Sequence, residues 1–167
     1  MRNNILKTIS YLILSIFLTA SFVSCEPVES VPDASDIAID DFGLRATWVV
    51  EFYWDGDYAG ENTIRTYNTG DNLTSEFWLD DIQHGWGLLT KINVNPNDLT
   101  FSGTDLDELY YGVTVTITEG KITKDGATTP SGDVVDSIYF KAEFSDIPGE
   151  IWEYTGYKST AKINDYP

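Results

Sequence analysis

Alternation of apolar and polar residues beyond residue 42 is the feature that most constrains the fold of this chain. In residues 44–54 every even position is apolar and the odd positions are mostly polar. A period of two places successive side chains on opposite faces of an extended chain, as a strand with one buried face requires. Residues 110–118 and 134–144 repeat the pattern, and no stretch sustains the 3.6 period of a helix. The chain is therefore predicted to be all-β.

Turn-forming residues divide this region into further segments. Additional strands are predicted at residues 61–68, 73–80, 85–95, 99–102, 121–123 and 150–162. Turns are predicted at residues 55–57, 95–98 and 119–120, and loops at residues 103–109 and 124–133. Eight or nine consecutive strands with short connections favour an antiparallel up-and-down β-barrel over a two-sheet sandwich, because closure removes exposed sheet edges.

The N-terminus has the layout of a secretory signal. Arg2 and Lys7 precede an apolar stretch over residues 9–23, and Ser24 and Cys25 follow it. The stretch is shorter than the ~20 apolar residues of a spanning helix. Residues 22–25 resemble the bacterial lipobox, with Phe in place of the usual Leu. We therefore predict cleavage before Cys25 and attachment of lipid, such as palmitate, to that cysteine; a plain secreted protein cleaved nearby is the alternative.

Cys25 is the only cysteine of the chain, so it cannot form an intramolecular disulfide, and lipidation explains both its number and its position. The next residues mix Pro, Ser, Asp and Glu, which is typical of a linker. The predicted organisation is a signal peptide at 1–24, a flexible acidic tether at 25–41 and a barrel domain at 42–167. We expect an exported protein held by its lipid on the bacterial cell envelope, at the outer membrane.

The charge of the chain is strongly negative. Its formal net charge is −17, and cleavage before Cys25 would leave eight basic against 27 acidic residues, or −19. This acidity disfavours binding to nucleic acid and to anionic membrane patches. It indicates either a soluble, non-sticky surface or selection of a cationic partner or calcium. One histidine and no remaining thiol exclude an ordinary zinc site. Residues 93–98 echo a calcium loop but lack its sixth-place glycine. No metal and no cofactor is predicted.

Several segments resemble one known family. They are Tyr67-Asn68-Thr69, Glu76-Phe77-Trp78-Leu79-Asp80-Asp81, Lys91-Ile92-Asn93-Val94, Leu99-Thr100-Phe101-Ser102, Gly126-Ala127-Thr128-Thr129-Pro130-Ser131-Gly132 and Asp136-Ser137-Ile138-Tyr139-Phe140. Over residues 44–160 the chain is similar to the lipid-binding putative hydrolase family of Bacteroidetes lipoproteins. The resemblance implies a calycin/lipocalin-like β-barrel on an exported lipoprotein that binds lipid. It supplies no catalytic residues.

Aromatic residues are the candidates for contact with a ligand. A barrel of eight strands is just wide enough to be filled by its own side chains or to hold one small ligand. Packing as the hydrophobic core is the alternative role, and the sequence leaves both open. Phe77 and Trp78 are neighbours on one strand, so one of the two should face outward. The candidate lining residues are Trp48, Phe52, Trp54, Trp86, Phe140 and Trp152.

A catalytic role depends on His84, the sole histidine and hence the only imidazole base for a Ser-His-Asp arrangement. Asp80, Asp81 and Ser75 lie near it in sequence, but no Gly-x-Ser-x-Gly elbow is present; His84 in a hairpin turn is the alternative. Three functions remain open. The favoured one is binding of a lipid or other hydrophobic small molecule. The others are an esterase-type hydrolase acting on lipid or glycan esters, and an accessory surface protein whose packed barrel contacts another protein.

Overall fold

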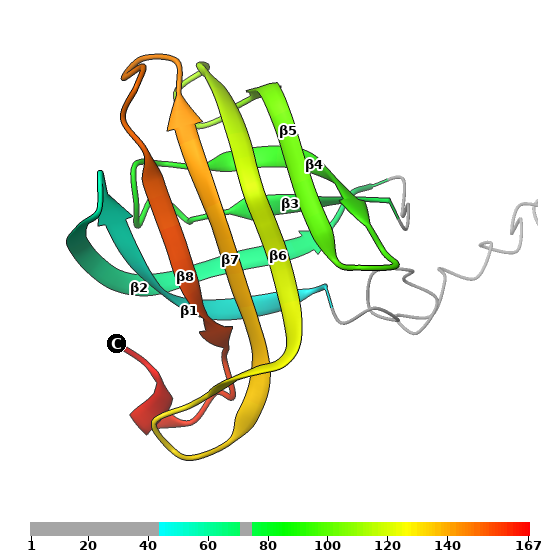
Figure 1. Ribbon diagram of the computed structural model, residues 1–167, viewed down its shortest axis with the longest axis vertical. Helices are drawn as coiled ribbons and strands as arrows, with labels where there is room; N and C mark the ends of the chain where they lie inside the picture. Colours follow the sequence, from blue (N-terminus) through cyan, green and yellow to red (C-terminus); the bar gives the residue numbers. More distant parts are fainter. Residues whose placement is uncertain (1–43, 71–74) are drawn as a thin grey trace, which may run out of the picture. The chain divides into compact units, whose positions relative to one another are not determined.

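Eight antiparallel strands form a closed barrel. The structure is a computed structural model, and it describes residues 44–70 and 75–167 (Figure 1). Each strand pairs with the next in sequence, and β8 pairs with β1 to complete the ring. The predicted fold is therefore confirmed. The predicted signal peptide and tether, with Cys25, lie outside the described residues. The strands are β1 Ala46–Trp54, β2 Asp57–Asn68, β3 Glu76–Asp80, β4 Leu89–Asn95, β5 Thr100–Asp107, β6 Thr114–Thr128, β7 Val134–Phe144 and β8 Trp152–Lys158.

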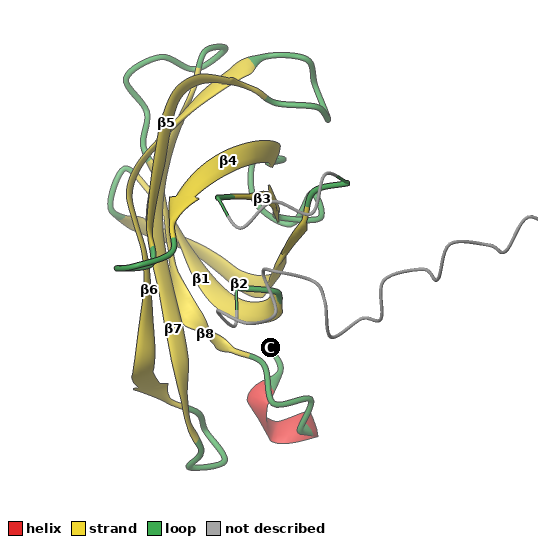
Figure 2. Cartoon of the chain, turned by 90° about the vertical axis from the view of Figure 1, so that its right-hand side faces the viewer, coloured by secondary structure: helices red, strands yellow, loops and turns green. Residues whose placement is uncertain are grey.

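The barrel has two faces that cross one another. Strands β5 to β8 run side by side as one tall face, and β1 to β4 curve across it (Figure 2). The faces join at β8 and β1, whose register runs from Trp48–Lys158 to Trp54–Trp152. They also join where β4 pairs with β5 at Val94–Phe101 and Asn95–Thr100.

Because consecutive strands run in opposite directions, successive connections lie at alternate ends of the barrel. Strands β1, β3, β5 and β7 finish at the same end, so the connections β1–β2, β3–β4, β5–β6 and β7–β8 all lie there. We call this end the rim; its connections lie at the left and top of Figure 1. The other three connections and the start of β1 lie at the far end. Segments widely separated in sequence therefore meet at the rim.

Side chains fill the interior of the barrel. Aromatic rings form a continuous series across it, with centroid distances of 5.3 Å for Phe77–Phe101, 5.9 Å for Phe101–Phe140, 4.4 Å for Phe140–Tyr154 and 5.1 Å for Phe52–Tyr154. These rings belong to a single cluster of buried apolar residues that draws on all eight strands. A barrel of this strand number is narrow enough for such packing.

Residues expected to form a turn in the middle of β6 form a β-bulge instead. The turn at Glu119 and Gly120, and the separate strand at 121–123, are wrong, because β6 continues through them to Thr128. Glu119 has a φ of 57°, and the register between β6 and β7 shifts there. A bulge uses a residue in the left-handed region just as a turn does, while the chain keeps its direction.

Two predicted loops are also shorter than expected. Residues 124–128 belong to β6, where Asp125 has a φ of 51° beside a second register shift. Residues 103–107 belong to β5, where Asp105 has a φ of 51°. Conversely, β4 begins only at Leu89 and β6 only at Thr114, so residues 81–88 and 108–113 are connections at the rim.

Phe77 and Trp78 divide between inside and outside, as the strand pattern predicts. The Phe77 ring is fully buried in the core, whereas Trp78 is half-buried outside it. Trp78 lines a surface hollow of about 320 Å³ together with Leu106 and Leu109 of the β5 region.

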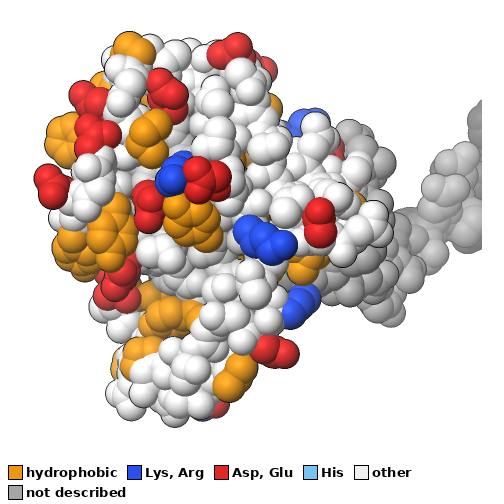
Figure 3. All heavy atoms as spheres, viewed as in Figure 1, with side chains coloured by type: hydrophobic (Ala, Val, Ile, Leu, Met, Phe, Trp, Pro, Cys, Tyr) orange, Lys and Arg blue, Asp and Glu red, His pale blue; other side chains and the backbone are white. Residues whose placement is uncertain are grey.

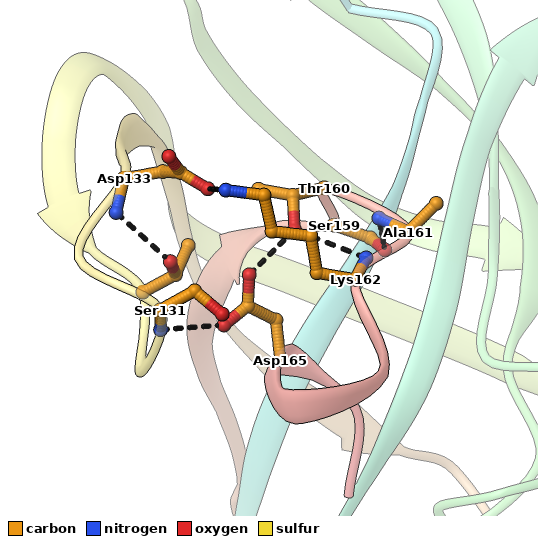
Figure 4. A network of polar contacts seen from close by, with 8 residues as sticks. Ser131, Asp133, Ser159, Thr160, Ala161, Lys162 and Asp165 are labelled. Carbon is orange, nitrogen blue, oxygen red and sulfur yellow. Dashed lines mark hydrogen bonds and ion pairs between the residues drawn. The ribbon is translucent and has the colours of Figure 1, made fainter.

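The C-terminal segment is tied to the far end of the barrel by a buried carboxylate (Figure 4). Asp165 is fully buried, and it accepts hydrogen bonds from the Ser131 backbone N–H (2.7 Å) and the Thr160 hydroxyl (2.5 Å). An ion pair between Lys162 and Asp133 lies beside it. Desolvation alone would raise the pKa of Asp165, but the hydrogen bonds together hold it below its usual value.

Candidate ligand-binding rim

Three tryptophans from different parts of the chain stack at the rim. The register of β1 and β8 places Trp54 directly opposite Trp152, and the rings stack with centroids 6.1 Å apart and planes at 10°. Trp86, from the β3–β4 connection, packs against Trp152 at 5.9 Å. The exposed fractions are 45% for Trp54, 36% for Trp86 and 8% for Trp152. We call these three residues the tryptophan stack.

Hydrogen bonds between two connections hold Trp54 in place. Its indole Nε1–H donates to Oε2 of Glu150 over 2.8 Å. The Ile151 backbone N–H donates to Oδ1 of Asp55, and the Asp55 N–H donates to the Ile151 carbonyl, each over 2.9 Å. The β1–β2 turn and the β7–β8 connection are thereby fixed to one another beside the stack.

Asp81 organises the β3–β4 connection that carries Trp86. Its carboxylate is buried and accepts from the backbone N–H groups of Gln83 (2.9 Å), Leu88 (2.7 Å) and Gly87 (3.1 Å), with the Tyr154 hydroxyl 3.4 Å away. Burial raises the pKa of Asp81, and the backbone donors partly offset that rise. A carboxylate in this position satisfies amide groups that would otherwise be buried without partners.

Glycines on both sides of Trp86 let the connection lie close to the barrel. A Cβ on Gly85 would stand 2.9 Å from Oδ2 of Asp81 and 2.9 Å from the Tyr154 hydroxyl. A Cβ on Gly87, whose φ is +103°, would stand 2.3 Å from the ring of Tyr111. Only glycine allows both approaches, so the sequence around Trp86 fixes where its indole lies.

Glu108 organises the β5–β6 connection in the way that Asp81 organises the β3–β4 connection. Its carboxylate is 1% exposed and accepts from the backbone N–H groups of Tyr110 (2.7 Å), Tyr111 (2.8 Å) and Leu89 (3.2 Å). The Tyr110 hydroxyl donates to Asp80 over 2.6 Å, and burial together with this carboxylate raises the pKa of Tyr110.

Over the residues that the structure describes, no group of three or more His, Cys, Asp or Glu side chains is placed to hold a metal ion.

A hollow of about 280 Å³ adjoins the tryptophan stack, and we call it the rim hollow. Trp86, Tyr111 and Asp146 line it, each from a different connection. Tyr111 is 60% exposed. Sequence reasoning missed Tyr111 and Asp146 as site residues, since the alternating pattern assigned Tyr111 to a strand and nothing local distinguishes Asp146. Figure 3 shows hydrophobic side chains toward the left and upper left of the barrel, with acidic side chains among them.

The structure divides the six aromatic residues proposed to line a ligand site. Trp48, Phe52 and Phe140 are 2% exposed or less and belong to the core cluster. Trp54 and Trp86 are partly exposed at the rim, and Trp152, which is buried and also belongs to the core cluster, packs against both. Within the described residues, the indole Nε1–H of Trp152 is buried without an acceptor. An orphaned donor of this kind is costly.

His84 lies exposed in the β3–β4 connection. Its backbone N–H donates to the Asp81 carbonyl, and its ring Nδ1 is 2.8 Å from the Thr63 carbonyl. Because a carbonyl only accepts, Nδ1 carries the proton in this contact. Ser75 stands before β3 and His84 after it, at opposite ends of that strand, and the Asp80 and Asp81 carboxylates bond to other groups. The structure therefore does not bring together the proposed catalytic set.

Comparison with known proteins identifies a family. The model of the family described as lipid-binding putative hydrolase matches residues 33–162, which span the barrel. No curated protein matches the chain. Among the described residues, no helix has the length and apolar character needed to cross a membrane. By its match over most of its length, this chain belongs to the lipid-binding putative hydrolase family.

Proposed function

We propose that this protein binds an amphipathic lipid at the rim of its barrel, and that it does so as an exported protein anchored through lipid on Cys25. One observation carries the proposal for the site. Two rings of the tryptophan stack, Trp54 and Trp86, are exposed at one end of a barrel whose interior is already filled by its own side chains. The lipid-binding character of the family supports a hydrophobic ligand.

The energetics of the stack suit an acyl chain lying across it. Large exposed rings held by hydrogen bonds lose little conformational freedom when a ligand covers them. Covering ~150 Å² of apolar ring surface contributes about 4 kcal/mol before the costs of association.

The proposed anchor is compatible with a ligand at the rim. The support for lipidation is the signal-like N-terminus that ends at Cys25. Strand β1 enters the barrel at Ala46, at the end opposite the rim. The covalent link from the preceding residues is therefore remote from the tryptophan stack.

The test is calorimetric titration with dodecyl maltoside below its micelle concentration. We compare the wild-type chain without its signal with the double variant Trp54→Gln/Trp86→Gln. The variant removes the two exposed indoles and should bind at least about ten-fold more weakly. The control is Val134→Gln, which removes an exposed apolar side chain at the far end and should change nothing. Circular dichroism verifies the fold of each variant, and equal affinity of the double variant would place the ligand elsewhere.

A second candidate function is favoured by the filled interior. A packed barrel is what an accessory surface protein needs if its loops contact another protein, and the rim would then be a protein interface. In the same titration this candidate requires that the folded wild-type protein bind no amphiphile. The esterase-type alternative gains no support from His84, whose ring contacts the Thr63 carbonyl rather than a carboxylate.

A further inference from the structure

The rim hollow has two aromatic walls and one carboxylate. Trp86 and Tyr111 supply the rings, and exposed Asp146 supplies the charge. Backbone hydrogen bonds to Asp81 and Glu108 fix the connections that carry the two rings. The backbone that carries the two rings is therefore held in place.

Such a combination attracts one class of chemical group. The face of an aromatic ring carries negative charge density, so it attracts a cation, and most strongly one without hydrogen-bond donors to desolvate. A carboxylate beside the rings adds a Coulombic attraction. Glu150 and Asp55 stand beside the adjoining stack, and the whole chain is acidic. An anionic headgroup would be repelled at this place.

The size of the hollow indicates a headgroup rather than a whole lipid. Its volume of about 280 Å³ is just below the roughly 300–1,000 Å³ range of ligand pockets. The exposed face of the tryptophan stack lies next to it, because Trp86 belongs to both. An amphiphile can therefore place its head in the hollow and its chain along the stack.

We propose that the rim hollow selects a quaternary ammonium group, carried by a cationic or zwitterionic amphiphile whose apolar chain lies on the tryptophan stack. This inference rests on the proposed function and specifies its ligand. The ring faces of Trp86 and Tyr111 hold the methyl groups of the cation, and Asp146 compensates its charge.

The experiment compares headgroups on one chain length. The wild-type protein is titrated by calorimetry with monomeric dodecyltrimethylammonium, dodecyl maltoside and dodecanoate, and with tetramethylammonium alone. Dodecyltrimethylammonium should bind at least about five-fold more tightly than the maltoside, and dodecanoate most weakly. Raising the salt concentration to about 0.5 M should weaken only the preference for the cation, because salt screens exposed charges.

Two variants test which residues produce the preference for the cationic headgroup. Asp146→Asn and Tyr111→Leu should each lower affinity for dodecyltrimethylammonium by about 2- to 5-fold, and should lower affinity for the maltoside less, so that the preference for the cation shrinks. The matched control is Asp125→Asn, which removes an exposed carboxylate toward the far end of β6; asparagine tolerates its positive φ. It should leave both affinities as they are.

The possible results separate this inference from the proposed function. Equal binding of all three dodecyl compounds, or full retention of the preference in both rim variants, overturns the headgroup inference and leaves lipid binding at the rim intact. Tetramethylammonium binding as tightly as the dodecyl compound shows a small free cation to be the ligand, which overturns the role of the chain. Failure of every dodecyl compound to bind overturns the proposed function itself.

Discussion

Buried carboxylates hold the backbone of two connections at the rim. Asp81 and Glu108 each accept three backbone N–H groups in the connections that carry Trp86 and Tyr111. In sequence, such residues merely added to a large acidic total, in which neighbouring carboxylates are expected by chance. Their importance comes from burial, because an amide left without a partner away from water is costly.

Replacing Asp81 by Ala should destabilise the protein and loosen the rim. The change leaves the N–H groups of Gln83, Gly87 and Leu88 without their acceptor, which we expect to cost about 2–3 kcal/mol. Urea unfolding measures the loss. Asp107→Ala, which removes an exposed carboxylate from the end of β5, should stay within about 0.5 kcal/mol of wild type. Equal stability of the two variants would show that Asp81 does not organise the connection.

At the scale of elements, residues typical of turns also occur at bulges inside strands. Asp105, Glu119 and Asp125 all have positive φ, and each stands in a strand with a register shift rather than at its end. A turn and a bulge place the same demand on the backbone of one residue. Which of the two forms depends on whether the next residues find a partner strand. Here β6 remains paired with β7 as far as Thr128.

The stabilisation that Asp165 gives the C-terminal segment should be lost in acid. The pKa of Asp165 is lower in the folded chain than its usual value of 3.8, so its carboxylate stabilises the fold above that value. This contribution is lost as the pH falls from about 4 through the lowered pKa. Thermal unfolding from pH 7 to pH 2.5 should therefore show wild type more stable than Asp165→Asn at neutral pH, with the difference shrinking below pH 4. A constant difference over that range would contradict this account.

At the scale of the whole molecule, a packed interior is separate from a rim that carries exposed aromatic rings. The aromatic series from Phe77 to Phe52 fills the centre, and the exposed rings of Trp54, Trp86 and Tyr111 lie at the rim. The far end receives the start of β1 and the C-terminal segment, including Asp165. The first described residues and the proposed ligand-binding residues therefore lie at opposite ends of one barrel.

Anchoring is tested on the full chain. When it is expressed in a bacterial host with alkyne-labelled palmitate, the wild type should incorporate label and fractionate with membranes. Cys25→Ala should lose the label and leave the membrane fraction, because no other cysteine can carry the lipid. Its barrel should show the same thermal unfolding as the wild type. Label retained by Cys25→Ala, or a mature wild-type chain beginning at another residue, would refute lipidation there.

The sequence by itself determined the architecture, since period-two alternation and short connections leave an up-and-down barrel as the natural way to bury one face of every strand. It also named Trp54, Trp86 and Trp152, but among six aromatic residues whose roles it left open. Only the tertiary structure separated these three from Trp48, Phe52 and Phe140, and added Tyr111 and Asp146. The physical reason is that alternation reports which face a side chain occupies, whereas the rim is assembled from connections far apart in sequence, which meet only when the barrel closes.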